Sequence, residues 1–76
     1  MHPAPESQKC PDKEALIADI RTSMNHVISI NNREMEAVMR GQFARLKELK
    51  VELREARVRK DSLLEAYYRH LREHGC

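Results

Sequence analysis

The chain has 76 residues, a formal net charge of +2 and charged side chains at 34% of its positions. This length allows one small domain, and no stretch approaches the ~18 consecutive apolar residues of a membrane-spanning helix. The N-terminus also lacks the apolar segment of a secretory signal, so we expect a cytoplasmic protein without a membrane partner. In that compartment we expect Cys10 and Cys76 to be free thiols or metal ligands rather than to form a disulfide.

The composition favours an all-α fold. All three prolines lie within the first eleven residues, and alanine, leucine, glutamate, arginine and lysine dominate the rest. These five are good helix formers, and a stretch without proline can be helical throughout. Residues 1–10, with Pro3 and Pro5 and no apolar periodicity, are predicted to form a disordered N-terminal arm.

Two amphipathic helices are predicted after the arm, at about residues 12–40 and 42–74, which together make residues 11–76 a helical hairpin. Pro11 suits the first helical position, and Asp12 favours the positive end of the helix dipole. Apolar side chains then recur every three or four residues in both segments, and the spacing from Leu46 to Ala56 is that of a coiled-coil seam.

Gly41 is the predicted turn of the hairpin because glycine is the usual residue just beyond the end of a helix. A break at Asn31-Asn32 is the alternative, since asparagine is a poor helix former. That break leaves a short helix beside a much longer one, whereas a turn at Gly41 gives helices of matched length. The apolar repeat also continues through the asparagine pair in phase. We therefore favour Gly41, and facing residues then have numbers that add to about 82.

The apolar stripes are too broad for one hairpin to bury. Ile17, Ile28 and Ile30 in the first helix cannot all face one partner, and the same holds for Val51, Leu64 and Tyr68 in the second. We therefore expect two copies to form a homodimeric four-helix bundle. The residues predicted to form the core or the oligomer interface are Ile17, Ile20, Met24, Val27, Ile28, Met35, Val38, Leu46, Leu49, Leu53, Leu63, Leu64, Tyr67 and Leu71.

One cluster has the chemistry of a metal site. His70 and His74 are four residues apart, so on a helix they share a face and can chelate one ion. Cys76 follows them, and the hairpin brings Cys10 to the same end, which completes a Cys2His2 set for zinc. The preferred interpretation is nevertheless exposed histidines that interact with the negative end of the helix dipole, and the zinc site and a Cys10–Cys76 disulfide are the alternatives. We expect no cofactor other than such a zinc ion.

A basic stripe between Lys47 and Lys60 is the second candidate. Its side chains, at helical spacing, are Lys47, Lys50, Arg54 and Arg57, followed by Arg59 and Lys60. Phosphates of DNA or RNA are one partner for such a stripe. Glutamates interleaved with the stripe lower its positive electrostatic potential, however, and no aromatic side chains are placed for base stacking. Solvated flanking positions that pair with a neighbouring helix are the preferred interpretation, so nucleic acid is not the expected partner.

No arrangement of catalytic groups is recognisable. The sequence lacks a nucleophile–base pair, a glycine-rich phosphate loop and the Glu-x-x-His pairs with which helical bundles hold two irons. We therefore expect a non-enzymatic helical interaction or oligomerisation module, with the nucleic-acid-binding protein and the zinc-stapled module as alternatives.

Overall fold

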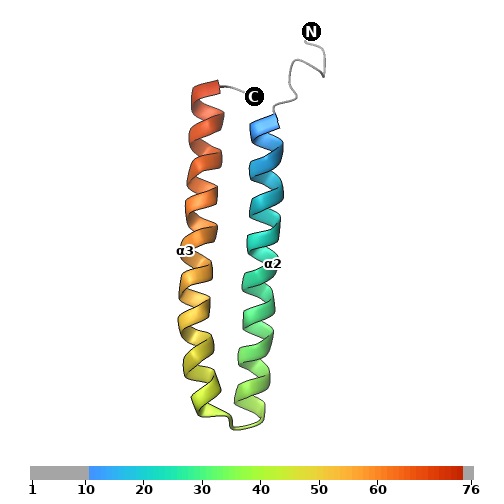
Figure 1. The fold of residues 1–76 in the computed structure, drawn as a ribbon, viewed down its shortest axis with the longest axis vertical. Coiled ribbons are helices and arrows are strands. Elements are labelled where there is room, and N and C mark those ends of the chain that lie inside the picture. The colour runs from blue at the N-terminus through green and yellow to red at the C-terminus, as the bar shows by residue number, and fades with distance from the viewer. Residues whose placement is uncertain (1–10, 75–76) are drawn as a thin grey trace.

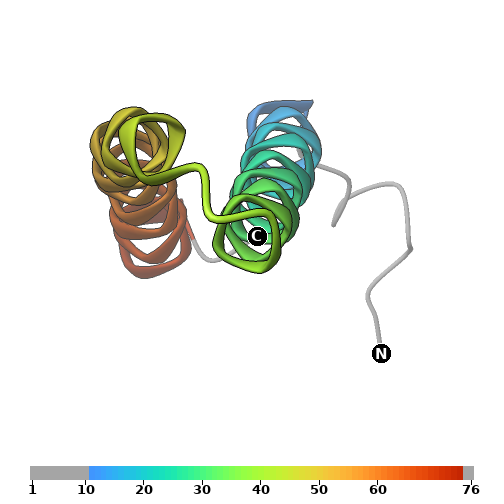
Figure 2. The same cartoon turned by 90° about the horizontal axis from the view of Figure 1, so that it is seen from below.

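The protein is an all-α helical hairpin (Figure 1). The computed structural model describes residues 11–74, except for the side chain of His74. Helix α2 spans Pro11–Met39 and helix α3 spans Phe43–His74, and the described residues contain no strand. The predicted hairpin is thus confirmed, and the predicted arm at residues 1–10 lies outside the described part. The hairpin is a rod about 58 Å long, whose two helices run antiparallel and cross at a shallow angle (Figure 2).

The turn is built by Gly41, as the sequence predicts. Gly41 has a φ of +67°, a conformation that strains every residue with a Cβ. The Gly41 N–H donates to the carbonyl of Val38 at 3.1 Å, and the Gln42 N–H donates to the carbonyl of Ala37 at 2.8 Å. This pair of bonds is the Schellman motif, which satisfies the last carbonyls of a helix. The chain can therefore reverse within three residues.

The alternative turn at Asn31-Asn32 is wrong. Helix α2 continues through both asparagines without interruption, and both residues are exposed. Their weak helix propensity is outweighed because the side chains on either side of them, above all Ile30, pack against α3.

The contact between the helices follows one repeat, which we call the seam. On each helix, the side chains at alternating spacings of three and four residues are buried or half-buried. In α2 these are Lys13, Leu16, Ile20, Ser23, Val27, Ile30, Glu34 and Ala37; in α3 they are Leu46, Leu49, Leu53, Ala56, Lys60, Leu63, Tyr67 and His70. In antiparallel helices such a repeat pairs residues whose numbers have a constant sum, here 83, as for Ala37 with Leu46.

The core is small and lies toward the turn half of the seam. Ile30 and Leu49 are completely buried, and Leu53, Ala37 and Ala56 accompany them, with Val27 and Leu46 packed alongside. Ile30 was not among the predicted core residues, but its burial beside the exposed Ile17 and Ile28 agrees with the expectation that these three cannot all face one partner. Small side chains at Ala37 and Ala56 let the helices approach closely. Toward the open end, Leu16, Ile20, Leu63 and Tyr67 are only half-buried.

Ser23 is the weak layer of the seam. Its residue surface is 5% exposed, and its Oγ atom has no hydrogen-bond partner. The constant sum places Ser23 level with Lys60, whose Nζ turns to Asp61 Oδ1 at 3.1 Å. A buried hydroxyl without a partner keeps its full desolvation cost.

Replacing Ser23 with alanine is therefore expected to stabilise the protein. Alanine removes the unsatisfied hydroxyl and is the better helix former, so the gain should be about 1 kcal/mol. Urea unfolding monitored by circular dichroism measures it. Ser29→Ala, a second serine of α2 that is only half-buried, is the matched control and should gain no more than the difference in helix propensity. Equal gains in both variants would show that the Ser23 hydroxyl is satisfied.

Candidate interaction surface

The seam leaves one row of α2 side chains uncovered, which we call the α2 stripe. It consists of Ile17, Met24, Ile28, Met35 and Val38, which are 37%, 39%, 55%, 65% and 56% exposed. All five were predicted as core or interface residues, and in the hairpin they lie outside the core. The other predicted residues, from Ile20 and Val27 on α2 to Leu71 on α3, are buried or half-buried.

Within residues 11–74, large apolar side chains are exposed more often than they are buried. Ten of them keep more than a third of their surface in solvent, whereas only Ile30, Leu49 and Leu53 are buried. Isolated exposed apolar residues are common on proteins, but a row at helical spacing marks a contact surface. The α2 stripe is therefore the strongest candidate for a functional site.

The α2 stripe borders a shallow groove between the two helices. Met35, Val38 and Asn31 line it from α2, and Leu46 and Lys50 line it from α3. A second open depression, which the acidic Glu34 and Asp61 also line, continues along α3 past Arg54 and Arg57. Apolar side chains of α2 and cationic side chains of α3 thus share one side of the hairpin.

The cations on this side form the α3 stripe, which is Lys47, Lys50, Arg54 and Arg57. All four are exposed, and none forms an ion pair with the described residues. The cations that do form ion pairs, such as Arg40 with Glu36 at 3.5 Å and Arg69 with Glu65 at 3.8 Å, lie elsewhere. The α3 stripe is therefore available to an external partner.

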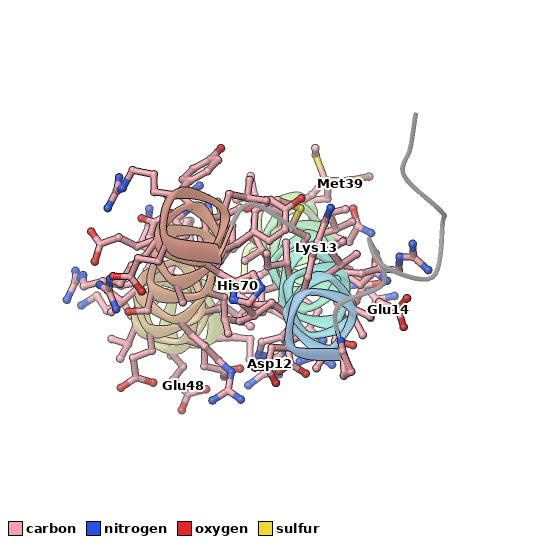
Figure 3. The ribbon with its side chains drawn as sticks, turned by 90° about the horizontal axis from the view of Figure 1, so that it is seen from above. Asp12, Lys13, Glu14, Met39, Glu48 and His70 are labelled. Carbon is pink, nitrogen blue, oxygen red and sulfur yellow. The ribbon has the colours of Figure 1, made fainter. Side chains whose placement is uncertain are left out.

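The opposite side of the hairpin has no large apolar side chain among the described residues that line its groove. Its groove is lined by His26, Glu52, Glu55, Ala56 and Arg59, so acids and bases are mixed there. Figure 3 shows the two sides from the open end: Met39 points away from the side to which Asp12 and Glu48 point. The α2 stripe therefore lies on one side of the hairpin and the groove of His26 and Arg59 on the other.

The predicted metal set lies largely outside the described residues. This applies to Cys10, Cys76 and the side chain of His74. His70 occupies a half-buried seam position and points from α3 toward α2 in Figure 3. Among the described side chains, no group of three or more histidines, cysteines, aspartates and glutamates is arranged to hold an ion. The zinc site therefore stays a prediction.

Excess EDTA is expected to leave the melting temperature unchanged. The constant sum of the seam places the cationic Lys13 level with His70, and a positive charge there opposes a divalent ion. Thermal melts of the freshly purified protein with and without chelator make the test. A fall of several degrees, restored by added Zn²⁺, would establish the metal site instead.

Three core residues of α2 were not predicted from the sequence. Ser23, Ile30 and Ala37 share one line of the seam, but the conspicuous apolar residues of α2 lie on the neighbouring line. The three-four spacing alone does not identify the correct line, because both lines of α2 have it. The polar Ser23 and Glu34 within that line concealed it.

Neither described helix combines the length and apolar character that crossing a membrane requires. No family model, no curated protein and no solved structure matches this chain in comparisons with known proteins.

Proposed function

We propose that this protein is a non-catalytic helical interaction module that associates with a second copy through the α2 stripe. The observation that carries this proposal is the row of five exposed apolar side chains at regular helical spacing on one side of α2. The grooves beside the row are open and shallow, which suits the docking of a helix better than the enclosure of a small substrate.

The size of the core supports self-association. A two-helix unit with two completely buried side chains has little apolar burial to offset its conformational entropy. Covering the α2 stripe removes further apolar surface from water, at about 25 cal/mol per Å². A second copy of the chain is a partner that is always as abundant as the chain itself. Coiled-coil packing of the seam and a four-helix bundle of two hairpins are parts of this proposal.

The test is the solution mass across a concentration series, measured by multi-angle light scattering. We expect the mass to rise from the 8.9 kDa of one chain toward twice that value as concentration increases. The melting temperature should rise with concentration as well, because association stabilises the folded state by mass action. A mass of 8.9 kDa throughout the series would refute the proposal.

A nucleic-acid partner is the second candidate, favoured by the four exposed cations of the α3 stripe, which form no ion pair with the described residues. The two candidates predict opposite responses to salt. Each copy carries a net charge of +2, so raising NaCl from about 20 to 500 mM should tighten the dimer by screening the repulsion between the two copies. Binding to DNA or RNA should weaken steeply over the same range. Titration of a fluorescent generic duplex, beside light scattering at both salt concentrations, separates the two.

A further inference from the structure

The outward side of α2 carries a second repeat with the same spacing as the seam. Alternating steps of three and four residues lead through Glu14, Ile17, Arg21, Met24, Ile28, Asn31, Met35 and Val38. All eight residues are at least a third exposed, and the α2 stripe supplies five of them. Helix α2 is therefore built to contact a helix on each of two sides.

From this second repeat we infer that two hairpins pair through their α2 helices in antiparallel orientation, with the two turns at opposite ends of the dimer. The inference rests on the proposed self-association and specifies its geometry. In the α2–α3 seam, antiparallel pairing joins residues whose numbers add to 83. The same rule applied to two copies of the second repeat joins residues whose numbers add to 52.

This pairing matches the chemistry of α2. Met24 lies level with Ile28 of the second copy, and Ile17 lies level with its Met35, so the central layers are apolar on both sides. Each pairing occurs twice because of the two-fold symmetry. Arg21 lies level with Asn31 of the second copy, which joins a donor to an amide acceptor. Only the outermost layers, Val38 with Glu14, combine an apolar and a charged side chain.

The other orientations match less well. In a parallel α2–α2 pair, each Arg21 lies against the other Arg21, and like charges at one level repel. When α2 instead packs on α3 of the second copy with both turns at one end, the paired numbers add to 85, so Met35 lies level with Lys50 and Ile28 lies level with Arg57. Apolar side chains then cover cations. The antiparallel α2 pair is the arrangement in which apolar residues cover each other.

The charges of the α3 helices also favour the antiparallel dimer. A parallel dimer superposes both α3 stripes at the same level along the rod. The antiparallel dimer instead keeps only Arg57 level with its own copy and displaces the rest of each stripe toward the other half of the partner's α3, where Leu64 and Tyr68 follow Asp61. It also brings Asp61 of each copy close to the level of Arg54 in the other. Asp61 is exposed, and among the described residues its ion-pair partner is its neighbour Lys60.

Disulfide trapping tests the orientation. Both native cysteines are replaced by serine, and Ile17→Cys and Met35→Cys are made singly in that background. We expect a mixture of the two variants to form the mixed disulfide at least ~10-fold faster than either variant forms a disulfide with itself. Met39→Cys, on α2 but outside the stripe and 78% exposed, is the matched control and should not trap with Ile17→Cys.

Rapid self-trapping of Ile17→Cys would show a parallel dimer and overturn the inference while leaving self-association intact. A solution mass of one chain for the parent without cysteines would instead refute the proposed function. The reduced variants are first checked by circular dichroism and light scattering. A second pair, Met24→Cys with Ile28→Cys, repeats the test at the centre of the dimer. A dimer that traps through neither mixed pair also contradicts the antiparallel arrangement.

Discussion

Replacing Leu49 with aspartate is expected to unfold the protein at room temperature. Leu49 is completely buried between the helices, and the substitution removes its apolar contacts, which alone costs about 2–5 kcal/mol. It also places a carboxylate where no cation or water can solvate it, which adds several kcal/mol. The total stability of a domain of this size rarely exceeds the sum. Circular dichroism at 222 nm should show loss of most of the helical signal.

Val51→Asp is the matched control for this substitution. Val51 lies two residues away on the same helix, has a side chain of the same class and is 49% exposed. The change should cost less than about 1 kcal/mol, because surface substitutions leave the packing intact. Unfolding by Val51→Asp together with a normal melt for Leu49→Asp would mean that α3 presents the opposite side to α2.

Replacing Ile28 with lysine is expected to dissociate the dimer while the hairpin stays folded. Ile28 is 55% exposed in the hairpin, so the substitution leaves the seam untouched. In the dimer it removes two buried isoleucines, each contributing about 1.5 kcal/mol or more, and adds two charges beside the cationic α3 stripes. The dissociation constant should rise by roughly 100-fold or more, since each 1.4 kcal/mol is a factor of ten. Sedimentation equilibrium measures it.

Met39→Lys is the control for the dimer interface. Met39 is the most exposed of the large apolar side chains and lies on α2 outside the stripe. The same change of charge and side-chain type there should leave the dissociation constant within a few-fold of wild type. Equal dissociation by both variants would show that net charge, rather than the α2 stripe, controls association.

The fold was predictable because two local signals agree with the long-range packing. Gly41 is the one residue near the middle of the chain that takes a positive φ without strain, and the apolar repeats on either side of it have similar lengths. Consistency between turn chemistry and periodicity specifies a hairpin. The asparagine pair favours a break by propensity alone, and packing of Ile30 outweighs that preference.

The division of α2 into two contact lines was not predictable from periodicity. Apolar residues cover such a wide arc of α2 that either line can serve as the seam, and the more apolar line faces solvent in the hairpin. The deciding factor is the fit with α3: Ala37 and Ser23 are small enough to let the helices approach, whereas Met24 and Met35 are not. Side-chain volume at the contact, rather than hydrophobicity, selects the seam.

The most direct test of the central claim uses the methionines of the unmodified protein as probes. With ¹³C-labelled methyl groups, NMR can measure how strongly a soluble paramagnetic agent relaxes Met24, Met35 and Met39 at several protein concentrations. If the α2 stripe pairs with a second copy, Met24 and Met35 become protected from the agent as concentration rises, while Met39 stays accessible. Equal accessibility of all three methyl groups at every concentration would contradict that claim.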